Sequence, residues 1–117
     1  MEWDEQKEIK EEKIYNLFRC GYLDVREWLK ATDIVIIPLG GTEQHGRHCP
    51  VCTDSLATEL PCQIAAEMAN VPYSQLIPVG YSPQHLHPPG IGSGTITFSA
   101  STYQNVLYDI GKSLIHN

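Results

Sequence analysis

Polar groups that could hold a metal ion are concentrated in the loop that spans residues 40–54. Glu43 and His45 are two positions apart, so in an extended segment both side chains point the same way. Asp54 follows at the expected start of a helix. Two carboxylates and an imidazole suit a borderline divalent ion such as zinc or manganese. Because Asp54 has two oxygens, it could bridge two ions about 3.5–4 Å apart, and such a pair would polarise a carbonyl and deprotonate a shared water.

Other interpretations of the same loop stay open. Taken singly, Glu43 is typical of a surface carboxylate and Asp54 of a helix cap. A compact structural zinc module is less favoured, because all four of its ligands would come from eight consecutive residues. The ligands of this module would be His45, His48, Cys49 and Cys52. A third interpretation is a redox Cys-x-x-Cys pair, which normally lies at a helix N-terminus, whereas here its second cysteine precedes the expected cap.

A second loop, residues 80–94, contains three prolines and four glycines. Ser82 and His85 could donate hydrogen bonds to a polar ligand in a pocket that this loop closes. The alternative is a rigid proline–glycine connection with histidines in solvent. The glycines do not match a phosphate-binding loop, and the chain has no Gly-x-Ser-x-Gly nucleophile motif.

An apolar strand is expected before each loop. Residues 33–39 form a continuous, largely β-branched run that ends at Gly40, which is typical of a strand buried on both faces of a parallel sheet. Residues 75–79 are the second candidate. A helix is expected after each loop, so the order strand, loop, helix, strand, loop, helix predicts an α/β fold.

The expected helices have apolar faces. The first long helix should begin at Thr53 or Asp54 and reach about Asn70, with a kink or a late start at Pro61. A short strand at 95–98 should precede the second long helix. Asp24 is expected to cap a short helix over 24–29. The inward residues should be Leu56, Leu60, Ile64, Ala65 and Met68 in the first long helix, and Val106, Leu107, Ile110 and Leu114 in the second, which starts at Ser99 or Ser101.

Composition sets the class of protein. The 117 residues are 42% hydrophobic and carry 14 acidic and 8 basic side chains, a formal charge of −6. This predicts one soluble domain or a piece of a larger one, without a membrane span or a signal peptide. The acidic balance argues against nucleic acid as a partner. Four cysteines are too few for a disulfide scaffold, so we expect a cytoplasmic protein with reduced thiols. Residues 1–20 are expected to be an acidic extension and 21–117 the domain.

The motifs of both loops, taken in order, resemble the creatininase (creatinine amidohydrolase) family. The resemblance lies in Ile-Ile-Pro-Leu-Gly-Gly-Thr-Glu-Gln-His-Gly-Arg-His over residues 36–48 and in Thr53-Asp54. It continues in Gly-Tyr-Ser-Pro-Gln-His over 80–85, in Pro89-Gly90 and in Gly-Thr-Ile-Thr over 94–97.

The resemblance implies a three-layer α/β fold with a mostly parallel central sheet. It implies a hydrolase that opens cyclic or linear amide C–N bonds of a small polar substrate, using two divalent ions that are zinc or manganese, with iron as a further option. Glu43 would bind one ion, His45 the other, and Asp54 both, while Ser82 would lie near the substrate. A homo-oligomer is expected for the complete protein.

The chain also departs from the family pattern. Arg47 and Cys49 replace the usual proline and leucine beside His48, Cys52 stands where glycine is common, and residues 87–94 are longer than usual. Family members continue into a strand with an Asn-Gly-His motif that supplies further ligands. The sequence therefore corresponds to an N-terminal half, truncated after the second major βα unit. The alternative function is an inactive fragment that binds metal weakly or assembles with another chain.

Overall fold

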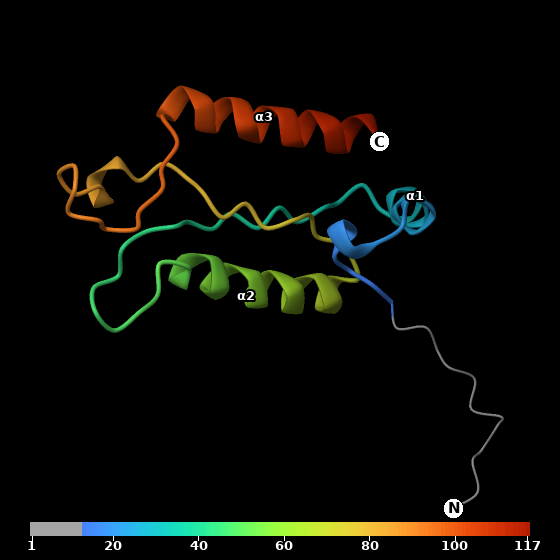
Figure 1. Ribbon diagram of the computed structural model, residues 1–117. Helices are drawn as coiled ribbons and strands as arrows, with labels where there is room; N and C mark the ends of the chain where they lie inside the picture. The colour runs from blue at the N-terminus through green and yellow to red at the C-terminus, as the bar shows by residue number, and fades with distance from the viewer. Residues whose placement is uncertain (1–12) are drawn as a thin grey trace, which may run out of the picture.

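The computed structural model describes residues 13–117, in which helices and short 3₁₀ turns are joined by extended segments (Figure 1). The helices are α1 (Tyr22–Ala31), α2 (Thr53–Ala69) and α3 (Ala100–His116), and the 3₁₀ turns are η1 (Leu17–Arg19) and η2 (Pro83–His85). Figure 1 shows α2 and α3 on opposite sides of the extended chain, which gives a layer of extended segments between two helical layers. Within residues 13–117, no helix is long and apolar enough to cross a membrane.

Two extended segments, residues 34–40 and 72–78, run parallel to each other. Ile36 lies opposite Tyr73, and Leu39 lies opposite Ile77. Between these bridges the first segment advances three residues and the second advances four, so one extra residue bulges out of the second segment. The described residues therefore contain isolated bridges instead of the continuous strands expected at 33–39 and 75–79. Among residues 13–117 the predicted central sheet is seen as this pairing together with a few other isolated bridges.

The segment before α1 also pairs with Tyr73. The backbone N–H of Tyr73 donates to Tyr15 O, and the backbone N–H of Leu17 donates to Tyr73 O, both at 2.9 Å. The indole N–H of the buried Trp28 donates to Ile14 O at 2.7 Å. Residues 14–17 thus pack on the domain, while residues 1–12 of the expected acidic extension lie outside the described residues.

Helix α1 is longer than expected at both ends. Gly21 occupies its N-cap position, and Asp24, the expected cap, lies in the first turn instead. Trp28 is buried, while Val25 and Leu29 are half-buried on the same side. The predicted apolar face is therefore correct, but the predicted cap is wrong. A carboxylate in the first turn still interacts favourably with the helix dipole.

Helix α2 begins at Thr53 and continues through Pro61, so the alternative of a late start is wrong. Its predicted inward face is also wrong. Four large apolar side chains at four-residue intervals are between 48% and 83% exposed, and Ala65 is exposed as well. Ser55 and Ala66 are the buried residues of the helix. We call the exposed set Leu56, Leu60, Ile64 and Met68 the outer stripe of α2.

Close approach to the backbone explains why small residues face inward. A Cβ atom placed on Gly40 would lie 2.5 Å from Ser55 Oγ and 2.8 Å from its Cα, so the glycine backbone and α2 are in direct contact. Larger side chains on this side of the helix would hold it away from the extended segment. The large apolar residues of α2 are consequently on the other side.

Residues 95–98 connect the two loops before α3 begins. Ile96 lies antiparallel to Thr42, and Thr97 lies parallel to Gly80. Helix α3 then begins after Ser99, whose hydroxyl accepts a hydrogen bond from the Thr102 N–H at 3.3 Å, as one of the two predicted starts requires. The predicted inward residues of α3 are half-buried.

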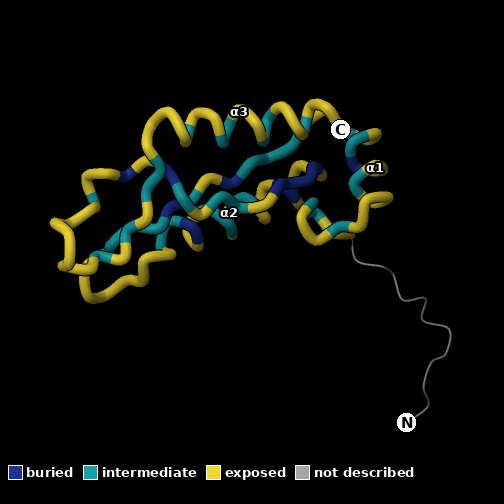
Figure 2. Tube along the Cα trace, turned by 45° about the horizontal axis from the view of Figure 1, so that its top comes forward, coloured by how far each residue is buried: buried dark blue, intermediate teal, exposed yellow. Residues whose placement is uncertain are grey.

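The buried part of the chain lies along the extended segments, which carry most of the dark blue in Figure 2. Pro38, Pro72 and Ser82 are fully buried, and Val71 and Tyr73 are nearly so. Burial, together with the nearby Glu59 carboxylate, raises the pKa of the Tyr73 phenol. The predicted loops begin where these segments end, so the core holds the polar loops at one end of the molecule.

Candidate metal centre

The first loop is anchored to the start of α2 by one serine. The Ser55 hydroxyl accepts a hydrogen bond from the Gly41 N–H at 3.3 Å and donates one to Gly41 O at 2.9 Å. Ser55 follows Asp54 in the first turn of the helix, where the helix dipole favours a negative charge. The clamp therefore places the Asp54 carboxylate beside the backbone that leads to Glu43 and His45.

Four polar side chains form two carboxylate–imidazole pairs at this end of the molecule. Glu43 Oε2 lies 3.3 Å from His85 Nε2, and Asp54 Oδ1 lies 3.6 Å from His45 Nε2. These side chains are between 21% and 44% exposed, so each keeps an accessible edge. The two loops predicted to carry chemistry thus meet through Glu43 and His85.

The second oxygens of the two carboxylates turn toward the same glycine. The position of a Cβ atom on Gly41 would be 3.3 Å from Glu43 Oε1 and 3.7 Å from Asp54 Oδ2. A side chain at Gly41 would therefore occupy the space that both carboxylates face. This arrangement explains why the loop begins with two small residues.

The His45 ring is oriented by its own loop. Its Nδ1 lies 3.2 Å from Glu43 O, and because a carbonyl oxygen can only accept a hydrogen bond, this contact favours the tautomer with its proton on Nδ1. In a neutral ring Nε2 then has the free electron pair that a metal ion requires. This nitrogen is the one that faces Asp54.

The donor types fit a divalent ion, but the described residues do not form a complete coordination shell. In the range 13–117, no three His, Cys, Asp or Glu side chains converge closely enough to hold an ion. Glu43, His45 and Asp54 are brought to one region as members of two pairs. The structure places oxygen and nitrogen atoms that could bind a metal near Gly41. Which of these atoms binds which ion stays a prediction.

Ser82 is fully buried, and its hydroxyl has no hydrogen-bond partner among residues 13–117. Its backbone N–H donates to Thr97 Oγ1 at 2.8 Å, and its carbonyl accepts from the His85 N–H at 3.1 Å. An unpaired buried hydroxyl costs about 1–3 kcal/mol, so such a group is usually satisfied by a ligand or a water. The Ser82 hydroxyl is therefore free to form a hydrogen bond with a ligand or a water molecule.

Thr95 connects the two loops, a role that was not predicted from the sequence. Its hydroxyl accepts a hydrogen bond from the Gln44 N–H and donates one to His85 O, both at 3.0 Å. Spacing along the chain could not predict this contact, because Gln44 and Thr95 meet only after both loops fold. A threonine directly after the Gly-rich stretch was the one available signal.

The Cys/His alternatives receive no support from the geometry. Cys49 and Cys52 are exposed free thiols, His48 is exposed, and these side chains do not gather with His45 around a common centre. Burial, and secondly the Asp24 carboxylate, raise the pKa of the Cys20 thiol, which disfavours its thiolate form.

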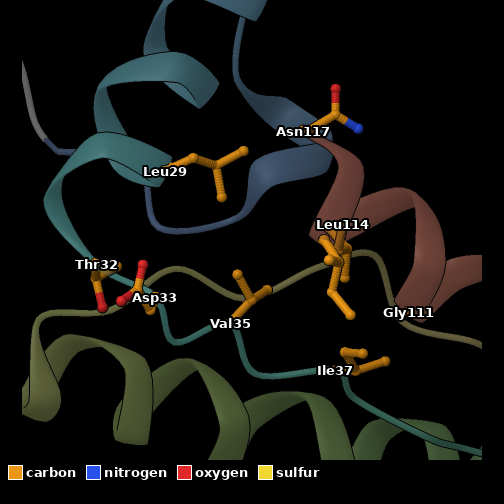
Figure 3. Close-up of a pocket in the computed structure, with 9 residues that line it drawn as sticks. Leu29, Thr32, Asp33, Val35, Ile37, Gly111, Leu114 and Asn117 are labelled. Atoms are coloured by element: carbon orange, nitrogen blue, oxygen red, sulfur yellow. The ribbon is translucent and has the colours of Figure 1, made fainter.

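Two hollows of the structure lie away from these pairs. One of about 550 Å³ is found between α1, α3 and the start of the 34–40 segment (Figure 3). Leu29 of α1, Leu114 of α3, and Val35 and Ile37 of the extended segment line it. This hollow is largely apolar and has no carboxylate–imidazole pair, so we do not assign the candidate site to it.

Solved creatininases share this fold. The structure of a creatinine amidohydrolase (creatininase) is 25% identical, with a TM-score of 0.78, over 89% of this chain and 41% of that one. A creatininase variant of the zinc–zinc type and a manganese creatininase, each 24% identical, give TM-scores of 0.79 and 0.78 over the same shares. Divalent metal ions therefore occur in creatininases of this fold.

The family follows from the sequence match. A model of the creatininase (creatinine amidohydrolase) family matches residues 20–117, so the chain belongs to the creatininase family. It is also 39% identical over 62 residues to the 3-dehydro-scyllo-inosose hydrolase of Thermotoga maritima, covering 52% of this chain and 20% of that protein. The chain spans about a fifth of this hydrolase and about two fifths of the solved creatininases.

Proposed function

We propose that this chain contributes part of the active site of a metal-dependent hydrolase that acts on a C–N bond of a small polar substrate. One observation carries the proposal: the pairs Glu43–His85 and His45–Asp54 lie together beside Gly41, at the end of the extended segment 34–40. Membership of the creatininase family and the hydrolase from Thermotoga maritima support the hydrolytic class.

The proposed metal ligands are Glu43 for one ion, His45 for the other and Asp54 for both. Divalent ions, when bound, polarise a carbonyl group and lower the pKa of water. The chain's own contribution is orientation: Ser55 holds the loop against α2, and the Glu43 carbonyl fixes the His45 ring. The zinc-type and manganese-type creatininases favour these metals. Three protein ligands do not fill two coordination shells, so we propose that further ligands come from outside these residues.

Ser82 is the proposed substrate-binding residue. Its buried hydroxyl has no partner among the described residues, so a polar atom of a substrate could satisfy it. The loop that carries it is joined to the metal-ligand loop through Thr95. We infer that substrate binding and metal binding depend on the same contact between loops.

Asp54→Asn tests the metal assignment. We expect the variant to lose zinc and manganese affinity by more than about tenfold and to lose hydrolysis, because the amide cannot supply two anionic oxygens. Asp24→Asn is the matched control, since Asp24 also lies in the first turn of a helix but away from the pairs. Equilibrium dialysis with each metal measures affinity in the full chain. Unchanged affinity and activity in Asp54→Asn would remove Asp54 from this role.

A second substrate class is favoured by one comparison. The Thermotoga maritima relative is named for 3-dehydro-scyllo-inosose, whereas the family model is named for creatinine. Incubating the protein with creatinine, a formylated amine and the inosose, with product analysis by mass spectrometry, separates these classes. Turnover of the inosose alone would contradict the C–N assignment and leave the hydrolase class intact.

The alternative is an inactive fragment that binds metal weakly or assembles with another chain. Weak metal binding without turnover of any substrate would favour it.

We also propose that the complete protein is a homo-oligomer, because the outer stripe of α2 leaves an apolar helix face exposed. Sedimentation of the protein at micromolar concentration tests this, and a monomer would contradict it.

A further inference from the structure

We propose that His85 is a positioning residue that fixes the orientation of the Glu43 carboxylate; this inference rests on the proposed function. The pair joins the two loops directly, with Nε2 and Oε2 3.3 Å apart. A proton on Nε2 would let the ring donate to Glu43, because a carboxylate only accepts hydrogen bonds. His85 then acts through Glu43, without taking a place in a coordination shell of its own.

The contact determines where the other oxygen of Glu43 points. With Oε2 held by His85, Oε1 turns toward Gly41, where Asp54 Oδ2 also points. Without the imidazole, the carboxylate could rotate about its terminal torsion, which is broad for glutamate. Two carboxylate oxygens on one side of a glycine are useful for a shared ion only if both stay there.

The backbone of His85 is held independently of its ring. Its N–H donates to Ser82 O at 3.1 Å, and its carbonyl accepts from Thr95 Oγ1, which also accepts from the N–H of Gln44. Gln44 is the neighbour of Glu43 in the chain. The same two loops are therefore tied twice, once through Thr95 and once through the His85–Glu43 pair, so the imidazole starts from a fixed position.

A merely structural role has to be distinguished from a positioning role. The His85 and Glu43 side chains are 33% and 21% exposed, so we expect their pair to add a small but measurable coupling to stability and to have its larger effect on metal binding. His87, two residues further along, is exposed and has no side-chain contact among the hydrogen bonds and ion pairs of residues 13–117. This neighbour offers a matched control from the same loop.

Metal affinity is the decisive measurement. Zinc and manganese dissociation constants of the full chain are compared for His85→Ala, His85→Gln and His87→Ala by competition with a chelator of known affinity. We expect His85→Ala to weaken binding by about 10–100-fold, as is typical when a residue that orients a ligand is lost. His85→Gln should recover most of this affinity, because its amide N–H can donate to Glu43, and His87→Ala should bind like the wild type.

The electron paramagnetic resonance spectrum of bound Mn²⁺ gives a second readout that does not depend on turnover. It should change in His85→Ala and remain unchanged in His87→Ala, because only the first variant frees the Glu43 carboxylate. Equal affinity and equal spectra in His85→Ala and the wild type would overturn the inference. An equal loss in His87→Ala would overturn it too, since the effect would then belong to the loop in general.

A metal-free experiment separates this inference from the proposed function. Unfolding midpoints of His85→Ala, Glu43→Gln and the double variant are measured in chelator. Non-additive shifts support the contact, and additive shifts overturn it. If the wild-type chain bound neither metal, the proposed function would fail, while the double-variant result would still decide whether His85 holds Glu43.

Discussion

Helices α2 and α3 have the same length, but they turn different side chains toward the extended segments. Helix α2 presents Ser55 and Ala66, and its outer stripe is exposed. Helix α3 presents half-buried apolar residues such as Val106 and Leu107. The difference follows from position, since α2 begins at the candidate metal centre and must approach Gly40 closely, whereas α3 only covers the extended chain. A helix that builds a site thus uses its inner face for close contact at the cost of apolar burial.

The largest test of this difference is a pair of glycine substitutions. Gly40→Ala should destabilise the chain by about 1–3 kcal/mol, because its Cβ would lie 2.5 Å from Ser55 Oγ and 2.8 Å from the helix backbone. Gly111→Ala should stabilise it by roughly 0.5–1 kcal/mol, since Gly111 lies inside α3 with nothing within 4 Å of its added Cβ. Urea unfolding measures both. Equal effects of the two substitutions would contradict the close approach of α2.

Gly40→Ala also connects packing to the site. If α2 moves away from the loop, the Ser55–Gly41 hydrogen bonds weaken and Asp54 shifts relative to Glu43. Zinc affinity should therefore fall with stability in Gly40→Ala and remain unchanged in Gly111→Ala. A destabilised Gly40→Ala chain with wild-type metal affinity would separate the clamp from the metal centre.

The next test compares large side chains on the two helices. Leu107→Ala should cost about 1–2 kcal/mol, less than a fully buried leucine because Leu107 is only half-buried. Leu60→Ala, in the outer stripe, should change the stability of the monomer by less than about 0.5 kcal/mol, because the side chain is 59% exposed. The free energy of unfolding at low protein concentration is the measurement. A large cost for Leu60→Ala that grows with concentration would show that the stripe is covered in an oligomer.

The positions of helices α2 and α3 along the chain could be predicted from the sequence better than the side chains that each helix turns inward. The start of α2 at Thr53 and the Ser99 cap of α3 could be predicted because caps and spacing act over a few residues, while the three metal ligands in one loop stay a prediction. The inner face of α2 could not be, because four apolar residues at helical spacing normally face a core. The reason for the exception, a contact between Gly40 and Ser55, exists only in the folded chain.

The same limit applies to the candidate site. Glu43, His45 and Asp54 could be grouped because eleven residues of loop and a helix start connect them. The partner of Glu43 could not be predicted, since His85 lies in the other loop and nothing in its spacing points to Glu43. The bulge between Tyr73 and Ile77 could not be predicted either, because the pairing register of this segment depends on the facing segment 34–40.

The smallest expected effect concerns the two helix starts. Ser99 caps α3 with its hydroxyl, whereas Cys52 at the N-cap of α2 makes no side-chain hydrogen bond and has a backbone conformation outside the extended region. Ser99→Ala should therefore cost roughly 1 kcal/mol, and Cys52→Ala less than about 0.5 kcal/mol. Thermal unfolding of both variants in chelator checks the difference. An equal loss of stability in Cys52→Ala and Ser99→Ala would mean that the start of α2 depends on its N-cap residue. In that case the Ser55–Gly41 hydrogen bonds would not be the main contact that holds Asp54 at the candidate metal centre.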